Sequence, residues 1–529
     1  RMGRNPYADP SLHYLGPMDQ VCSNCGATHF AGEKSTSGDT TLYTMCCFRG
    51  KVQLYDPGPV PPVIKELFTG VHVQSPNFLA NARRYNAALA MASVKAQQGS
   101  VPGNGPKPYK IQGQVYHLRG PLLPGDGQQM QYGQLYFAES SEALSARMAH
   151  HANSRLDRSV MGELQEALMQ SNDLVRGYIA AREMVEQRRR QSSDDVNIDE
   201  LRLVFCQRPT VDPRVYNAPR VDEVALVTWG VPDDQFPEYA LIIRPREGHL
   251  RNINALSELC DPMSYPLFFP AGTPGWNPQM KLTLPEGAER QRTKLTALDY
   301  YLYRLAYRPP LEGRNMSMLH YGKHLFQQYI VDAYAKVESL CLMFVKNNQS
   351  RLRVESYQGL NDHMVTEQAG GDVVPGRMVV LPSSFRWGPR YINECYQDAM
   401  AVCREYGKPD LFLTMTCNPD WEEIRENLLP GQTAFDRPDI VARVFDLKMK
   451  AFIKEVTQTG VLGKVAAYCW TVEFQKRGLP HLHLLLIFAE SDKLRDADDV
   501  ERLVRDLITL QCEEDHDGEQ QPVEGPGRD

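Results

Sequence analysis

The chain has 529 residues, of which 42% are hydrophobic and 23% charged, close to the values of an average globular protein. This length predicts several folded units and excludes a single small module. No apolar run is long enough to cross a bilayer, and the N-terminus lacks the apolar stretch of a secretory signal. We therefore expect a soluble, intracellular protein without a membrane partner.

The formal net charge of −7 is unevenly distributed. Residues 489–529 hold 14 acidic and 5 basic residues, a charge of −9, which leaves +2 for the rest of the chain. Residues 281–353 hold 12 basic and 6 acidic residues, a local charge of +6. The global charge therefore does not exclude a nucleic-acid partner. Residues 491–529 are expected to form a disordered acidic tail.

Four of the 12 cysteines cluster near the N-terminus. Cys22 and Cys25 have the spacing of a zinc knuckle, and Cys46 and Cys47 follow after twenty further residues. The spacing predicts a structural zinc site, whose remaining ligands come from Cys46, Cys47 and His29. Adjacent cysteines tend to point apart, so at least one of Cys46 and Cys47 is expected as a ligand, and which of Cys46, Cys47 and His29 completes the site stays open. The alternative is a set of four structural thiols without metal.

Apolar residues at helical spacing predict a helix over residues 77–92 and two helices between 140 and 190, with a break near 151–154. The second of these two helices ends in Arg188, Arg189 and Arg190. Such a cluster fits a localisation signal or a phosphate contact, but a solvated helix end is the more common structure.

Alternating apolar and polar residues predict strands over 111–118 and 134–138, and residues 201–280 form a second strand-rich section. Residues 319–347 predict a long amphipathic helix. The patterns that fall within residues 63–280 together predict a mixed α/β region there.

A basic and aromatic stretch covers residues 290–308. Interleaved arginines and tyrosines can follow a phosphate backbone and stack on bases, so Arg290, Arg292 and Lys294 are candidate DNA contacts. The same stretch also has the apolar spacing of an ordinary helix core face, formed by Leu295, Leu298, Leu302 and Leu305. Both interpretations stay open.

Residues 465–488 predict a hairpin of two apolar strands. His481 and His483 lie two residues apart, so they share one face of the second strand, and Glu473 on the first strand can face them. Two imidazoles and a carboxylate predict a site for Mn or Mg with open positions for a phosphate oxygen. The alternative is a hydrogen-bond network of the same residues without metal.

Residues 411–421 predict a strand that leads into a helix, with Asn418 as the N-cap and Pro419 at the first helical position. We expect this strand in the middle of the sheet, beside the histidine strand, with its polar end at the same pocket. Thr414 and Thr416 are individually interpreted as scaffold residues.

Together these segments resemble the Helitron helicase-like domain, the Rep-type HUH endonuclease region of Helitron transposases. The most specific segment is Glu473–His483, which reads EFQKRGLPHLH. Further segments that carry the resemblance are 326–332, 349–353, 381–385, 396–399 and 407–421. The N-terminal cysteines with residues 50–52 resemble the zinc-finger-like region of these proteins, and residues 214–219 resemble their intervening segment.

The resemblance implies an α+β, multi-domain chain whose C-terminal part is a Rep-type HUH nuclease core, an antiparallel sheet flanked by helices, incomplete here. The expected parts are a zinc-finger-like segment (1–57), a mixed α/β region (63–280), the Helitron helicase-like HUH domain (281–490) and the acidic tail (491–529). It also implies a nuclear location. Lys476 and Arg477, in the hairpin connection, are candidate phosphate contacts, although a solvated hairpin tip fits them nearly as well.

The resemblance further implies rolling-circle transposition on single-stranded DNA. A metal held by His481, His483 and Glu473 polarises the scissile phosphate, and a tyrosine attacks it to form a 5′-phosphotyrosine. Only 46 residues follow His483 and none is a tyrosine, so no catalytic nucleophile is assigned, and the helicase region of the family lies outside this sequence.

We therefore expect a fragment, a truncated gene model or a decayed copy that binds single-stranded DNA without forming a covalent adduct. The alternative is a non-catalytic DNA-binding or zinc-dependent interaction protein derived from such an element.

Overall fold

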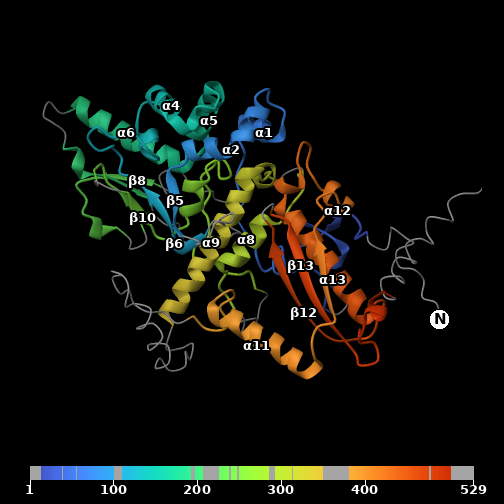
Figure 1. The fold of residues 1–529 in the computed structure, drawn as a ribbon. Coiled ribbons are helices and arrows are strands. Elements are labelled where there is room, and N and C mark those ends of the chain that lie inside the picture. Colours follow the sequence, from blue (N-terminus) through green and yellow to red (C-terminus); the bar gives the residue numbers. More distant parts are fainter. Residues whose placement is uncertain are drawn as a thin grey trace, which may run out of the picture. The chain divides into compact units, whose positions relative to one another are not determined.

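The structure is a computed structural model, and its elements are labelled in Figure 1. It describes residues 14–37, 40–54, 56–99, 110–191, 197–205, 225–236, 240–246, 250–284, 292–311, 314–348, 381–475 and 478–501. The chain divides into two compact units. The N-terminal unit holds residues 20–29 and 34–344, and the C-terminal unit holds residues 1–19, 30–33 and 345–529. The division into four segments made from the sequence stays a prediction.

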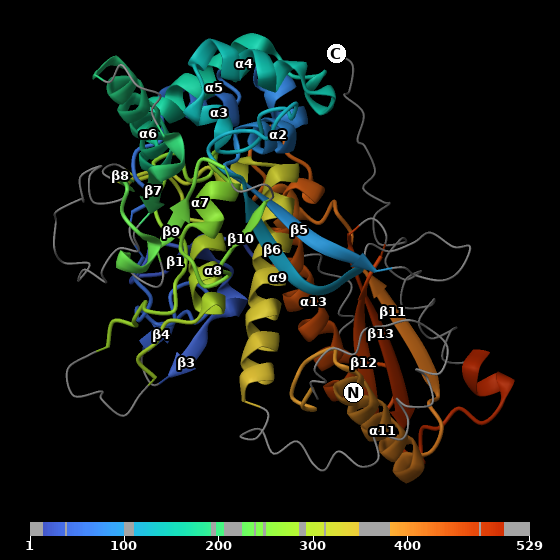
Figure 2. The same ribbon diagram turned by 90° about the vertical axis from the view of Figure 1, so that its left-hand side faces the viewer.

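Helices gather on one side of the N-terminal unit, as Figures 1 and 2 both show. They are α1 (Pro62–Thr69), α2 (Ser75–Leu89), α3 (Gln134–Phe137), α4 (Ser140–Ala149), α5 (Arg158–Ser171) and α6 (Asp173–Gln191). The predicted helix over 77–92 is confirmed by α2, whose Phe78, Tyr85 and Leu89 recur at helical spacing and are fully buried. Later in the unit come α7 (Cys260–Ser264), α8 (Ala297–Leu305) and α9 (His324–Asn347).

The predicted break near residues 151–154 is confirmed by a short 3-10 helix at His151–Asn153. The prediction of one helix after this break is wrong, because α5 and α6 are separate. Asn172 lies between them, and its Oδ1 accepts hydrogen bonds from the backbone N–H groups of Leu174 and Val175. An asparagine at this position caps the start of α6 and so interrupts an otherwise continuous apolar pattern.

The strands of the N-terminal unit pair antiparallel in small sheets. The larger sheets have the orders β10-β6-β5 and β8-β7-β9, formed by β5 (Ala92–Gly99), β6 (Lys110–Arg119), β7 (Leu201–Phe205), β8 (Ala225–Trp229), β9 (Leu241–Ile243) and β10 (Arg251–Ile253). Two short hairpins pair β1 (Gln20–Val21) with β2 (Thr28–His29) and β3 (Ser35–Ser37) with β4 (Thr40–Leu42). The predicted strand at 111–118 and the strand-rich section at 201–280 are confirmed.

The predicted strand at 134–138 is wrong, because these residues form α3. All four residues of α3 are buried, so the apparent alternation did not separate an exposed face from a buried one. Tyr132, with φ of 54°, turns the chain just before α3, and the Gln134 side chain donates to the Leu123 carbonyl at 3.0 Å. Local turn geometry therefore decides the structure here.

A buried ion pair joins three helices of the N-terminal unit. Lys336 of α9 lies 3.2 Å from the Asp261 carboxylate of α7, and both side chains are almost fully buried. Tyr301 of α8 donates to the same carboxylate at 3.0 Å. Burial, and then the charge of Asp261, raises the pKa of Tyr301 well above its usual value. This network fixes the register of the three helices through specific partners rather than through apolar packing alone.

The C-terminal unit contains a three-stranded antiparallel sheet in the order β11-β13-β12, visible in Figure 2. Its elements are α11 (Pro389–Tyr406), β11 (Leu411–Thr416), α12 (Glu422–Arg425), α13 (Pro438–Gln458), β12 (Val465–Phe474) and β13 (Pro480–Phe488). The predicted hairpin is confirmed by β12 and β13. The chain is thus an α+β protein with antiparallel sheets.

Two details of the predicted strand-to-helix unit are wrong. Within the described residues, β11 is an edge strand and the histidine strand β13 is central, because β13 pairs on both sides. The helix begins at Glu422, with Trp421 as its N-cap, rather than at Pro419. The Asn418 side chain accepts from the Asp420 N–H at 2.9 Å, which is a local turn that delays the helix.

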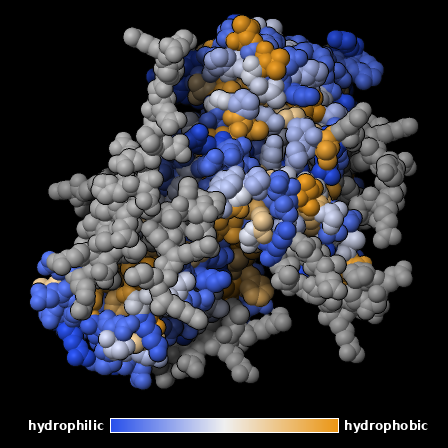
Figure 3. All heavy atoms as spheres, turned by 90° about the vertical axis from the view of Figure 1, so that its right-hand side faces the viewer, coloured by the Kyte–Doolittle hydropathy of each residue, from blue (hydrophilic) through white to orange (hydrophobic). Residues whose placement is uncertain are grey.

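In the described parts of the chain, none of the helices is both long enough and apolar enough to span a membrane. On the face in Figure 3, hydrophobic side chains form small separate groups among hydrophilic ones.

Candidate functional site

The two faces of strand β13 differ in exposure. Leu482, Leu484 and Leu486 are fully buried, whereas His481 and His483 on the other face are half-buried. We call these the leucine face and the histidine face. Helix α13 packs against β12 and β13, and its many buried apolar residues match the leucine face. The alternation of apolar and polar residues along β13 therefore leaves the histidines on an accessible surface.

The pairing register brings polar residues of both neighbouring strands onto the histidine face. His481 lies opposite Thr416 of β11 and Glu473 of β12, and His483 lies opposite Thr414 and Thr471. Directly opposite residues of antiparallel strands project to the same side. The structure thus brings together on one face the three side chains that the sequence singled out as metal ligands.

Glu473 reaches diagonally across the hairpin. Its Oε2 lies 3.1 Å from His483 Nε2, and the ring centroids of His481 and His483 are 4.7 Å apart. Two neighbouring ligands at about 2.1 Å from an octahedral ion lie about 3.0 Å apart, so the contact between Glu473 and His483 has the length of one edge of such a site.

His481 points partly away from this pair. Its Nδ1 lies 2.7 Å from Thr416 Oγ1, and in the described residues it does not complete a three-ligand group with Glu473 and His483 in which all ligand atoms lie within 4.8 Å of one another. The Glu473 side chain is 69% exposed on an edge strand, so a change of its rotamer can close the set without moving the backbone. The residues present therefore fit an ion after a side-chain adjustment.

Sequence reasoning missed two neighbours of these histidines. Thr416, interpreted as scaffold, contacts His481 directly. Phe412, two strand positions beyond Thr414, stacks on His483 with ring planes 12° apart and is 59% exposed. The alternation of residues 411–416 places Phe412, Thr414 and Thr416 on one face, and this periodicity was the available signal.

The four N-terminal cysteines converge in the N-terminal unit. Their sulfur atoms all lie within 4.8 Å of one another, and all four side chains are buried. The first pair lies in the turn between β1 and β2, where the Gly26 N–H donates to the Cys22 carbonyl at 2.8 Å. This is the only group of three or more potential ligands with such spacing in the described residues.

The sulfur positions fit tetrahedral zinc. The Sγ atoms of Cys22 and Cys47 are 3.7 Å apart, and those of Cys46 and Cys47 are 3.8 Å apart. A regular tetrahedron with Zn–S bonds of about 2.3 Å has edges of about 3.8 Å. The Gly50 N–H also points at Cys47 Sγ at 3.2 Å, as outer hydrogen bonds to metal ligands do. The cluster can therefore hold a metal such as zinc.

Both adjacent cysteines, Cys46 and Cys47, belong to the group of four sulfur atoms. Phe48, Arg49 and Gly50 have consecutive positive φ values of 46°, 58° and 81°, so the chain curls back and both sulfurs point inward. His29, which the spacing left open as a ligand, stacks on Tyr43 instead, with ring centroids 4.0 Å apart.

Interactions within the cluster shift the pKa values of two of its thiols. Hydrogen bonds from Cys46 and Cys47 lower the pKa of Cys25, and the positive charge of Arg308 lowers it further. The hydrogen bond to Cys25 raises the pKa of Cys46. The pKa values of these two thiols are therefore shifted in opposite directions.

The candidate DNA contacts are only partly described. Arg290, Lys476 and Arg477 lie outside the described residues. Arg292 lies 2.9 Å from the Asp299 carboxylate and over the ring of Phe48, and Lys294 is exposed.

The aromatic stretch before α9 is mainly structural. The buried face of α8 consists of Ala297, Tyr300 and Tyr301, whereas Leu298 is 52% exposed. The interpretation as a helix core face is confirmed in part, because Leu295 is buried and Leu305 packs against the core, whereas Leu298 is exposed and Tyr300 and Tyr301 also pack inward. Tyr300 and Tyr301 are buried, so they offer no surface for base stacking.

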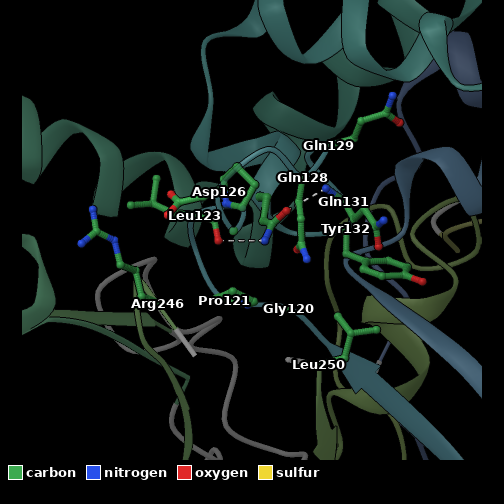
Figure 4. Close-up of a pocket in the computed structure, with 13 residues that line it drawn as sticks. Gly120, Pro121, Leu123, Asp126, Gln128, Gln129, Gln131, Tyr132, Arg246 and Leu250 are labelled. Carbon is green, nitrogen blue, oxygen red and sulfur yellow. Dashed lines mark hydrogen bonds between the residues drawn. The ribbon is translucent and has the colours of Figure 1, made fainter. Parts of the chain in front are cut away.

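A separate pocket of about 510 Å³ lies in the N-terminal unit between residues 120–134 and the segment near Arg246. Figure 4 shows Arg246 on one side of this pocket and Gln129 and Tyr132 on the other. Its lining is rich in amides, and one of them, Gln134, is already bonded to the Leu123 carbonyl. The lining lacks a cluster of titratable groups, so it offers binding surface rather than chemistry.

Comparison with known families identifies the C-terminal part of the chain. Residues 300–486 match the family described as the Helitron helicase-like domain at the N-terminus. The match covers the histidine face, including Thr416, Glu473 and both histidines. No curated protein matches the chain. Residues 300–486 therefore carry a Helitron helicase-like domain.

Proposed function

We propose that the chain is the N-terminal and partial endonuclease portion of a Helitron-type rolling-circle transposase. In this proposal the C-terminal unit is a Rep-type HUH core that binds single-stranded DNA through Mn or Mg at His481, His483 and Glu473. The observation that carries the proposal is that two imidazoles and a carboxylate share an accessible sheet face within the Helitron-like segment. A nuclear location belongs to the same proposal, because the substrate is chromosomal DNA.

The chain's own residues prepare this site. With its proton on Nδ1, His481 donates to Thr416 Oγ1 and keeps the Nε2 lone pair available as a ligand. His483 Nε2 and the Glu473 carboxylate are already 3.1 Å apart, about the distance between two neighbouring ligands of one ion. When bound, the ion supplies a Lewis acid that polarises a phosphate oxygen.

Three features support single-stranded DNA as the ligand. Phe412 offers an exposed ring beside His483, on which a base can stack. Lys476 and Arg477 follow Glu473 by a few residues in the sequence and remain proposed phosphate contacts. Arg290, Arg292 and Lys294 remain proposed contacts within the basic segment 281–353.

No nucleophile is assigned among the described residues. Tyr468 of β12 lies opposite Leu486 and therefore on the leucine face, on the other side of the sheet from the histidines. Helix α11 carries Tyr396, which is 58% exposed, but no described contact joins it to the histidine face. The proposal for this chain is accordingly metal-assisted DNA binding, with tyrosine transesterification left to the intact family.

We also propose that Cys22, Cys25, Cys46 and Cys47 hold a structural zinc ion, which the tetrahedral sulfur spacing supports. The second candidate function is a non-catalytic DNA-binding or zinc-dependent interaction protein derived from a Helitron. It is favoured by the cysteine cluster, whose ligand atoms are closer to ideal metal geometry than those of the histidine face.

An electrophoresis experiment tests the proposal. The purified chain is incubated with labelled single-stranded DNA and Mn²⁺, and each sample is run on a native and a denaturing gel. We expect a salt-sensitive complex on the native gel and no covalent band on the denaturing gel. Absence of binding at low salt contradicts the DNA-binding proposal. A covalent band that His481→Ala abolishes contradicts the assignment of no nucleophile.

A further inference from the structure

A second pocket lies beside the cysteine cluster in the N-terminal unit. It has a volume of about 240 Å³ and is lined by residues 24–25, 54–57, 303–310 and 314–320 in part. Arg304, Arg308 and Arg314 all line it. The carboxylate at its wall, Asp56, accepts from the Gly58 N–H at 2.8 Å and the Asn315 side chain at 2.6 Å. Three positive charges against one negative charge leave the pocket lining with a charge of +2.

The arginines have donors without partners among the described residues. Arg308 uses Nε and Nη1 on carbonyls of Cys25, Tyr303 and Ala306, but its buried Nη2 has no hydrogen-bond partner. The buried Nε and Nη2 of Arg304 form no hydrogen bond of regular geometry, and this guanidinium interacts with the Tyr329 hydroxyl. Buried guanidinium donors left unpaired are costly, and a group that accepts several hydrogen bonds removes that cost.

Packing fixes the positions of these guanidinium groups. The Arg308 guanidinium lies 3.9 Å from the ring centroid of Tyr303, and that of Arg304 lies 4.5 Å from the ring of Phe269. The Arg314 guanidinium lies against the backbone of Gly26, where a Cβ would be only 2.6 Å from its Nη1. Gly26, at φ of 73°, therefore permits the close approach of Arg314 to the knuckle.

We propose that this pocket binds a terminal phosphate group, a phosphomonoester or free phosphate. A phosphomonoester carries about −1.5 to −2 charges at pH 7 and three strong acceptor oxygens, which matches three arginines and a lining charge of +2. A phosphodiester within a DNA strand carries only one negative charge. The strand continues on both sides of it, so it needs a groove rather than a pocket. The inference stands apart from the proposed function, because no residue of the histidine face takes part.

Part of the arginine cluster also has a role at the cysteines. Arg308 donates to the Cys25 carbonyl and lowers the pKa of the Cys25 thiol, so it serves the metal cluster as well. Among the described residues, Arg314 forms no hydrogen bond to a cysteine carbonyl and no ion pair with a carboxylate. The cysteine cluster therefore does not explain why an arginine lies at this position. The test therefore uses Arg314.

The experiment uses the full chain and two oligonucleotides of identical sequence, one with a 5′-phosphate and one with a 5′-hydroxyl. Inorganic phosphate is the competitor. We expect the phosphorylated strand to bind more tightly, inorganic phosphate to compete, and Arg314→Gln to weaken this preference about 10- to 100-fold. Arg314→Lys, which keeps the charge but loses the planar fork, should fall between the two. Arg155→Gln, an exposed arginine of the same unit, is the matched control and should behave as the wild type.

The possible outcomes distinguish the source of the phosphate group from the alternative roles of Arg314. Competition by inorganic phosphate without a preference between the two strands identifies free phosphate or a nucleotide as the ligand and supports the pocket. Equal binding of both strands without competition by phosphate overturns the proposal. Loss of zinc from Arg314→Gln also overturns it, since Arg314 then serves the cysteines. His481→Ala should leave the preference unchanged, so a failure here is distinguishable from a failure at the histidine face.

Discussion

The contact between Thr416 and His481 allows a sharp test of the proposed metal site. Thr416→Val keeps the shape and β-branching of the side chain but removes the oxygen 2.7 Å from His481 Nδ1. Without this partner, the ring loses the bond that fixes its orientation and its tautomer. Partners of this kind typically change metal affinity 10- to 100-fold, which corresponds to about 1.4–2.7 kcal/mol.

Thr414→Val is the matched control. Thr414 lies on the same strand and the same face, opposite His483, but no side-chain hydrogen bond joins the two residues. Titration of the full chain with Mn²⁺, followed by electron paramagnetic resonance of the free ion, gives both affinities. We expect weaker binding only for Thr416→Val. Equal affinities for the two variants refute the argument that Thr416 orients a ligand.

Three further predictions concern the N-terminal unit. Cys46→Ser should abolish stoichiometric zinc, measured by atomic absorption, and lower the melting temperature; retained zinc contradicts the four-cysteine site. Lys336→Met should destabilise the unit by about 3–5 kcal/mol in denaturant titrations by leaving the buried Asp261 carboxylate without its cationic partner, and Asp261→Leu added to it should recover much of the loss. Burial lowers the pKa of His117 from 6.5 to about 4, so the unfolded state takes up the proton first as pH falls. Stability should therefore drop between pH 6.5 and 4, by up to about 3 kcal/mol, and His117→Phe should flatten this slope.

Much of the C-terminal unit was predictable because its signals are local. The two-residue spacing of His481 and His483 and a short connection between two apolar strands define the hairpin and the shared face of the two histidines. The edge position of β11 was not predictable in the same way, because strand order depends on pairing between segments about 70 residues apart in the sequence. A residue such as Thr416 becomes significant only once its partner across the sheet is known.

The errors in the N-terminal unit have local and tertiary causes. The helix α3 replaces a predicted strand because of the turn at Tyr132 and burial on all sides. In α8, Tyr301 packs inward with its hydroxyl bonded to Asp261, a partner that no pattern in the sequence reveals. The convergence of Cys46 and Cys47 depends on three consecutive residues with positive φ, two of which are not glycine.

We propose that the histidine face holds an ion that binds the phosphate of single-stranded DNA. Fluorescence anisotropy of a labelled single strand, titrated with wild-type chain and with His481→Ala at fixed ionic strength, tests it most directly when each titration is run with Mn²⁺ and with EDTA. We expect Mn²⁺ to strengthen DNA binding by the wild type and to have no effect on the variant, while both proteins bind equally in EDTA. The same gain with Mn²⁺ in both proteins contradicts it.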